Sequence, residues 1–315
     1  MNIKKKQIAF VGVFVVLVFA SCTKTIDDQL PENEPKLVIN GLINPDSVLM
    51  VNISKTVHVF ENESSNNLPF IQGATTKFYR DGEFLFNLEE GDNGYYSKPG
   101  YFPSLNHNYK IEIEKTGYPA IYAETIIPAP VLIESLDTTI VSWDGDEDYE
   151  GGLYYKESIH CELIYHDPSG PGNYYRLDCY LHYFYENDEY LARQYIYVDE
   201  NDEYLFDKTY GYLLWTDQLT DGNEVTIKFN FHPDGYYSDG GNPDNSSSAT
   251  YLLVLNSVSE DFYKYDKTRS LYFDTGGSND PFSEPVLIYT NVTDGFGVFG
   301  GYSNDTVSFQ YTYDY

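Results

Sequence analysis

One glycine pattern in the sequence has the spacing of a phosphate-binding loop. Gly295, Gly297 and Gly300 satisfy G-x-G-x-x-G, the fingerprint of dinucleotide-binding sites. Such a site needs a helix directly after the glycines and an acidic residue about 20 positions further on. The residues that follow, 302–307, are instead typical of a turn and a strand. We therefore expect these glycines to permit close approach between strands, and no cofactor is expected.

A second group has the spacing of a calcium ligand set. Asp144, Asp146 and Asp148 alternate as in an EF-hand loop. That motif requires glycine at its sixth position and glutamate at its twelfth, where this sequence has Tyr149 and Tyr155. The EF-hand is therefore excluded, and a looser surface Ca²⁺ site remains an alternative because carboxylates are dense here.

Two cysteines flanked by histidines could bind zinc or form a disulfide. His160 and Cys161 are strand neighbours and point to opposite faces, and so do Cys179 and His182, which excludes a four-ligand zinc site. A hairpin centred on 169–170 would place Cys161 opposite Cys179, close enough for a disulfide. A shift of one residue in register would put the two side chains on opposite faces.

Catalytic motifs are not found. Neither G-x-S-x-G nor H-E-x-x-H occurs, so no catalytic residue is assigned and a non-enzyme is predicted. The 33 tyrosines and two tryptophans indicate aromatic strand faces, which could stack on sugar rings, so glycan binding is kept as an alternative.

The elements that would position these residues are mostly strands. Six short alternating runs at 37–41, 48–53, 75–79, 83–87, 109–114 and 120–127 predict an immunoglobulin-like or transthyretin-like sandwich over 36–128. Asp81 and Gly82 indicate a tight hairpin between the third run and the fourth. Pro128 and Pro130 indicate a domain boundary.

Residues 131–315 predict a larger antiparallel domain, a β-meander or an open barrel, so the fold class is all-β. The sequence Glu-Asn-Asp-Glu-Tyr-Leu occurs at 186–191 and again at 200–205, where both copies fit hairpin turns. A Gly- and Asn-rich loop covers 230–250. One helix is expected, beginning with a capping box at 257–260 and continuing to Ser270.

The first residues are typical of an export signal. Three lysines at 4–6 precede an apolar run at 8–20, and small residues lead to Cys22, so 1–21 is predicted to be a lipoprotein signal with lipid attached to Cys22. Phe19 stands where an aliphatic residue is usual, which keeps a plain secretory signal open. Residues 22–35 are predicted to be a flexible tether. In it, Asp27 and Asp28 resemble the acidic signal of Bacteroidota lipoproteins, and this resemblance implies the outer face of the outer membrane.

The charge excludes one class of partner. The chain has 19 Lys and Arg against 49 Asp and Glu, a net charge of −30, which repels nucleic acid. An acidic surface of this kind aids solubility and favours cations or basic protein surfaces.

Several segments resemble the Bacteroidota lipoprotein family known as domain of unknown function 4249. They include 38–41, 167–176, 259–265 and the closing segment 280–303. The resemblance implies an outer-membrane lipoprotein, often encoded beside TonB-dependent receptors, with no established activity. We accordingly expect an accessory subunit that docks on such a transporter, with a stand-alone glycan-binding lipoprotein as the alternative. The docking surface is expected at Asp280, Pro281, Phe282, Glu284, Pro285, Gly295, Gly297, Phe299, Gly300 and Tyr302.

Overall fold

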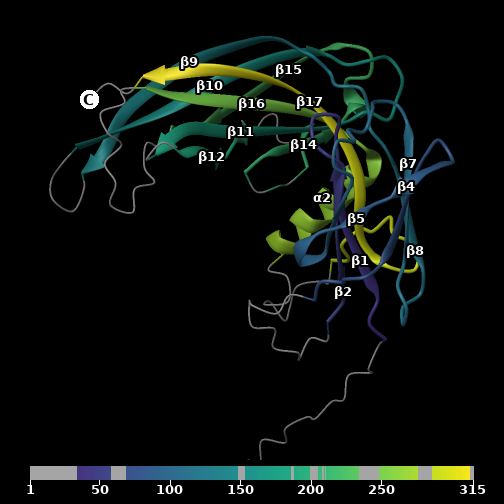
Figure 1. Cartoon of the computed structure of the whole chain (residues 1–315). Coiled ribbons are helices and arrows are strands. Elements are labelled where there is room, and N and C mark those ends of the chain that lie inside the picture. Colours follow the sequence, from purple (N-terminus) through teal and green to yellow (C-terminus); the bar gives the residue numbers. More distant parts are fainter. Residues whose placement is uncertain are drawn as a thin grey trace, which may run out of the picture. The chain divides into compact units, whose positions relative to one another are not determined.

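The computed structural model describes residues 34–57, 69–147, 153–185, 188–198, 205–207, 209, 211–233, 248–275 and 286–312, except for the side chains at 143–147, 153–156, 183–185, 188 and 248. These residues are mostly in strands, as predicted for an all-β protein, and their sheets do not close into a barrel (Figure 1). Within this part of the chain, no helix is both long and apolar enough to cross a lipid bilayer.

The first hydrophobic core is enclosed by two groups of strands. One is the four-stranded sheet β4-β3-β7-β8, and the other is the β1-β2-β6-β5 part of a nine-stranded sheet. The strands are β1 (Leu37–Ile43), β2 (Met50–Lys55), β3 (Thr75–Arg80), β4 (Glu83–Asn87), β5 (Glu89–Glu90), β6 (Tyr95–Ser97), β7 (Asn108–Glu114) and β8 (Ile121–Ile126), with a short 3-10 turn, η1, at Asp92–Gly94.

Alternation of apolar and polar residues explains these strands. In β7, Tyr109, Ile111 and Ile113 are buried, while Lys110 and Glu112 face outward. The predicted hairpin between β3 and β4 is confirmed. Its two turn residues have positive φ, 52° at Asp81 and 82° at Gly82, the backbone that a tight turn of this hand requires.

The second core lies between β12-β11-β16-β17 and a separate sheet, β13-β15-β10-β9. The elements here are β9 (Ile133–Glu147), β10 (Leu153–His166), β11 (Tyr174–Tyr185), β12 (Asp188–Gln194), β13 (Tyr197–Val198), β14 (Leu213–Thr216), η3 (Asp217–Leu219), β15 (Glu224–Phe231), β16 (Ser248–Val258), α2 (Glu260–Asp274) and β17 (Phe296–Thr312). The predicted hairpin of β11 with β12 is confirmed.

The predicted hairpin of β10 with β11 is wrong. β10 pairs with β9 and β15, whereas β11 pairs with β12, β14 and β16 in the other sheet. Residues 167–173 therefore carry the chain from one sheet to the other. Cys161 and Cys179 both face the core, in agreement with alternation of period two, but the same pattern fits a hairpin and an arch between two sheets.

β17 joins the two cores. Residues 296–301 pair in parallel with β1, and residues 302–312 pair antiparallel with β16 (Figure 1). Phe299 belongs to the first core and Tyr311 to the second. The division into domains at 36–128 and 131–315 stays a prediction, and one continuous strand contributes to both cores.

Close backbone contact explains the glycines of β17. A Cβ atom at Gly297 would lie 1.9 Å from the backbone oxygen of Ile39, and one at Gly301 would lie 2.2 Å from that of Ile126. Gly297 also has a φ of 98°, which side chains of L-residues rarely allow. The G-x-G-x-x-G spacing thus serves strand packing, and a strand follows it.

The single α-helix of the described residues begins two residues later than predicted. Its N-cap is Ser259, whose Oγ accepts a hydrogen bond from the Phe262 backbone N–H (3.3 Å), because Ser257 still belongs to β16. The Ser259 Oγ also accepts from the Gly301 N–H (3.1 Å). This cap therefore fixes the start of α2 to β17.

A buried ion network holds α2 against β11. The Arg176 guanidinium donates to both carboxylate oxygens of Asp178 (2.7 and 2.8 Å) and to Asp266 of α2 (2.6 Å). It also lies over the Tyr212 ring, 4.0 Å from its centroid. Burial by itself would lower the pKa of Arg176. The hydrogen bonds and charge of Asp178, together with the charge of Asp266, outweigh burial and raise the pKa of Arg176 overall.

Candidate functional site

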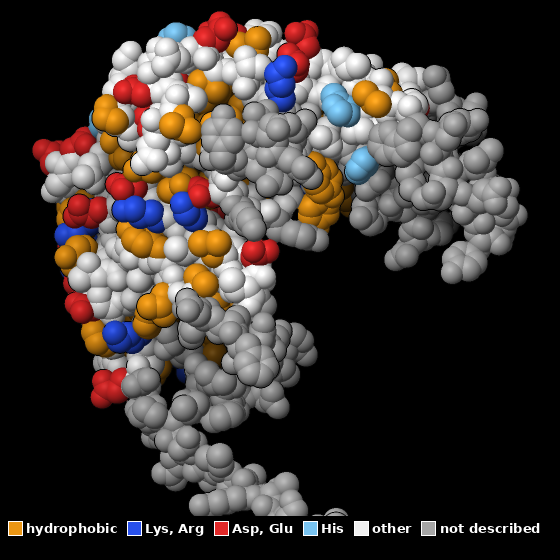
Figure 2. All heavy atoms as spheres, turned by 180° about the vertical axis from the view of Figure 1, so that it is seen from behind, with side chains coloured by type: hydrophobic (Ala, Val, Ile, Leu, Met, Phe, Trp, Pro, Cys, Tyr) orange, Lys and Arg blue, Asp and Glu red, His pale blue; other side chains and the backbone are white. Residues whose placement is uncertain are grey.

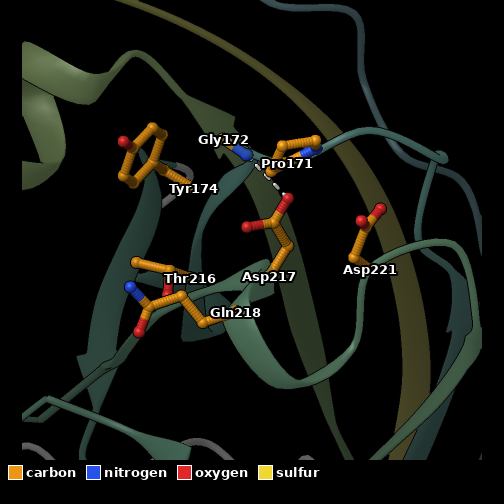
Figure 3. A pocket seen from close by; sticks show the side chains of 7 residues that line it. All are labelled: Pro171, Gly172, Tyr174, Thr216, Asp217, Gln218 and Asp221. Atoms are coloured by element: carbon orange, nitrogen blue, oxygen red, sulfur yellow. Dashed lines mark hydrogen bonds between the residues drawn. The ribbon is translucent and has the colours of Figure 1, made fainter.

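A shallow pocket of about 330 Å³ opens where the 167–173 loop meets the segment after β14 (Figure 3). The two segments approach because β14 pairs with the start of β11, which places Thr216 beside Tyr174. The side chains offer carboxylates, hydroxyls and an amide, groups that bind through hydrogen bonds or to cations. The lining residues are Pro171, Gly172, Tyr174, Thr216, Asp217, Gln218 and Asp221.

Asp217 is the central group of this pocket. Its side chain points toward the 167–173 loop (Figure 3), and the residue is only 2% exposed. Its Oδ2 accepts hydrogen bonds from the backbone N–H groups of Gly172 and Asn173 (both 2.9 Å) and from the Asn173 amide (3.2 Å). One buried carboxylate thus accepts hydrogen bonds from three donors of the 167–173 loop, which connects the two sheets.

Two further aspartates complete the cluster. Asp167 accepts a hydrogen bond from the Gly222 N–H (3.0 Å) and another from the Tyr175 hydroxyl. Burial raises the pKa of the Asp167 carboxyl, and these two hydrogen bonds act in the opposite direction. Asp221 accepts from the Gly170 N–H (2.7 Å).

The cluster resembles a cation site, but its hydrogen bonds give it another role. One oxygen from each of Asp167, Asp217 and Asp221 lies within 4.8 Å of the other two, and carboxylate oxygens are the ligands that Ca²⁺ prefers. Four of the six carboxylate oxygens, however, accept hydrogen bonds that fix the two loops. We therefore describe the cluster as a loop clamp.

Sequence reasoning did not find this clamp. The turn expected at 169–170 falls in the run 167–173, whose aspartate, glycines and asparagine are typical turn residues. Asp217 and Asp221 lie about 50 residues away on a different element, and no local pattern marks them.

We expect Asp217→Ala to destabilise the protein by about 2–3 kcal/mol, because three donors lose a charged acceptor. Asp221→Ala is the matched control, since Asp221 is exposed and accepts from Gly170 alone; its cost should stay under about 1 kcal/mol. Urea unfolding would measure both. Equal costs would contradict the central role of Asp217.

The cysteines predicted to form a disulfide are free thiols, and both are buried in the second core. The hairpin register that would have paired Cys161 with Cys179 is wrong, because β10 and β11 belong to different sheets, and both thiols lie in the core between those sheets. Burial raises the pKa of Cys161 to about 12 and places that of Cys179 well above its usual range.

Both thiols should resist alkylation in the native protein. A thiol with a pKa near 12 is deprotonated in only about 1 molecule in 10,000 at pH 8, and only the thiolate reacts. Mass spectrometry after iodoacetamide treatment should show both sites unmodified until urea is added. Rapid modification of the native protein, or an unfolded mass lower by two hydrogens, would contradict free buried thiols.

The segment expected to dock on a partner lies largely inside the protein. Phe299 is 0% exposed, Gly295 and Gly300 are buried, and the half-buried Tyr302 hydroxyl accepts a hydrogen bond from Asn44 (2.6 Å). The expectation is wrong for this segment, because its glycines bring β17 against β1 and β8.

The remaining predicted residues lie outside the described part of the chain. These are Cys22 of the lipid anchor, Asp280, Pro281, Phe282, Glu284 and Pro285 of the docking surface, and Asp148 of the loose calcium site, along with the side chains of Asp144 and Asp146.

The fold and this loop clamp define an all-β protein in which one long strand contributes to two hydrophobic cores. The chain belongs to the DUF4249 family, a domain of unknown function whose model matches residues 23–308. A search of curated proteins found no match.

Proposed function

We propose that this protein is a lipid-anchored protein of the outer-membrane surface and a non-enzymatic docking subunit of a TonB-dependent nutrient transporter. The observation that carries the proposal is how closely the first strand follows the predicted lipidation site. β1 begins at Leu37, 15 residues after Cys22. Even fully extended, that segment spans only about 50 Å. The β-sheet unit would therefore stay close to the membrane, where it meets an integral membrane protein at high effective concentration.

The surface chemistry supports a protein partner. The net charge of −30 favours a basic surface on the partner, through both attraction and faster association. Figure 2 shows acidic, basic and apolar side chains interspersed on the face it draws, a mixture that is also common at reversible interfaces.

Two measurements test the proposal. Metabolic labelling with a fatty-acid analogue should mark the wild type and leave Cys22→Ala unlabelled; label that persists in the variant would overturn the anchor. Affinity purification from gently solubilised outer membranes should recover a TonB-dependent transporter with the wild type. Recovery of no transporter under conditions that retain other transporter complexes would overturn the docking function.

One specific observation favours the alternative, a glycan-binding surface protein. Phe84, Tyr79, Lys110 and Tyr122 form a continuous group on the outer face of β4-β3-β7-β8. The Lys110 ammonium lies 5.7 Å from the Tyr79 ring centroid and 4.8 Å from that of Tyr122. Aromatic rings next to charged hydrogen-bonding groups are a surface on which sugars can stack and bond.

Glycan-array binding that is lost in Tyr122→Ala and kept in Tyr95→Ala would favour this alternative. The two tyrosines are similarly exposed, 42% and 44%, but Tyr95 lies on β6, outside the aromatic group. Binding that survives in both variants would exclude this surface.

A further inference from the structure

Most sheet edges in the described part of the chain are protected against pairing with another chain. An exposed edge offers free N–H and C=O groups, and proteins protect it by keeping the strand short, placing charges on it or covering it. β5 and β13 contain two residues each. β12 carries the exposed charged side chains of Glu189 and Arg193.

The outer edge of β8 is covered by the segment before β17. The Asn291 side-chain amide donates to the Glu124 carbonyl (2.9 Å), and the Thr293 N–H donates to the Tyr122 carbonyl (2.9 Å). These carbonyls would otherwise be available to an added strand. The protein thus closes an edge that is six residues long.

β9 is the longest of the described edge strands, and β4, at the edge of another sheet, has only five residues. β9 contains 15 residues and is the last strand in the order β13-β15-β10-β9, and among the described residues no strand pairs with its outer edge. The stretch from Thr138 to Ser142 carries no charge, is mostly β-branched, and is exposed at every position. These are properties of a strand that accepts a neighbour readily.

Apolar side chains on both faces of β9 lack cover. Ile140 pairs with the buried Ile159 and shares its core-facing side, yet Ile140 is 52% exposed because none of the described strands lies beyond it. Val141 points to the opposite face and is exposed too. A strand added beside β9 would cover apolar surface on both sides of the sheet.

The charges near this edge indicate which kind of segment fits. Glu134 and Asp137 on β9 are both exposed, and the chain as a whole is strongly acidic. A basic segment would be attracted, while a second copy of this chain would bring the same acidic residues and be repelled.

We propose that the outer edge of β9 is the docking site, and that its occupant is an extended basic segment of a partner protein that adds a strand to the sheet. Main-chain hydrogen bonds would supply affinity, and alternate side chains of the segment would cover Ile140 and Val141. This inference rests on the docking function proposed above, for which it names the surface and the chemistry of the partner.

Hydrogen exchange of the full chain tests the site directly. The probe is a ten-residue synthetic peptide of alternating valine and lysine. Comparison peptides replace lysine by glutamate, or carry two central prolines, which remove ladder hydrogen bonds. We expect the basic peptide to slow exchange over residues 133–142 at least tenfold, and the other two to leave it unchanged. No protection there, or equal protection by the proline peptide, would overturn the proposal.

Matched variants separate strand addition from general attraction of charge. Ile140→Lys should weaken binding of the basic peptide at least tenfold. Ile126→Lys on the covered edge of β8 should leave binding unchanged, although Ile126 is nearly as exposed, at 48%. Equal weakening by both variants would overturn the proposal, as would a concentration-dependent dimer of the wild type that Ile140→Lys abolishes.

The same variants distinguish this site from the proposed function. Recovery of a transporter by the wild type and by Ile140→Lys alike would refute the β9 site and leave the docking function standing. Protection of β9 by the basic peptide with no transporter recovered would support the edge and refute the transporter as partner.

Discussion

Replacing Gly297 by alanine is expected to destabilise the protein by more than about 3 kcal/mol, because two costs combine at this position. The backbone there has a φ of 98°, and the new Cβ would lie 1.9 Å from the backbone oxygen of Ile39. Backbone cannot rotate away as a side chain can, so β1 and β17 would have to separate along the register that joins Ile39 to Gly297.

Gly117→Ala is the control for the cost of the positive φ alone. Gly117 has a similar φ of 89°, but a Cβ there would meet nothing within 4 Å. Its substitution should cost only about 1–2 kcal/mol. Denaturant unfolding of both variants gives the comparison, and equal costs would mean that the contact of β17 with β1 is not as close as described.

Asp266→Ala should cost about 3–5 kcal/mol, since it leaves the buried Arg176 guanidinium without one of its two anionic partners. Asp266 also pairs with Arg269 at 3.2 Å, so a second cation loses its partner. The expected consequence is that α2 detaches from β11 at a lower denaturant concentration than the wild type requires.

The matched control lies on the same helix. Glu260 and Lys264 form an exposed pair at 2.7 Å, and Glu260→Ala should cost under about 1 kcal/mol. Unfolding curves followed by circular dichroism would measure both variants. Similar shifts for both would show that burial does not set the strength of the Arg176 network.

Local patterns in the sequence predicted the alternating strands and their turns but not which strands become neighbours. The turn at Asp81 and Gly82 was predicted correctly because its determinants lie within a few residues. The pairing of β1 with β17 was missed because it joins residues far apart in the chain, and alternation carries no information about a partner.

The candidate site was the least predictable part. Asp167 lies in a segment whose composition indicated a turn, while Asp217 is a single aspartate among 49 acidic residues. Its role depends on β14 pairing with β11, a contact that no local rule specifies. The proposed docking surface moved for a similar reason: the segment 295–302 was expected to face a partner, although its glycines indicated close approach between strands, and they lie against another backbone.

The strand shared by the two cores also determines when the protein can fold during its synthesis. β1 is made early, but its register partner Gly297 follows Ile39 by 258 residues, so the first core stays incomplete through most of translation. Contacts this distant along the chain slow folding. A nascent chain that stalls before β17 would expose the β1 edge and the cavity that Phe299 fills, and quality-control proteases would recognise it as unfinished.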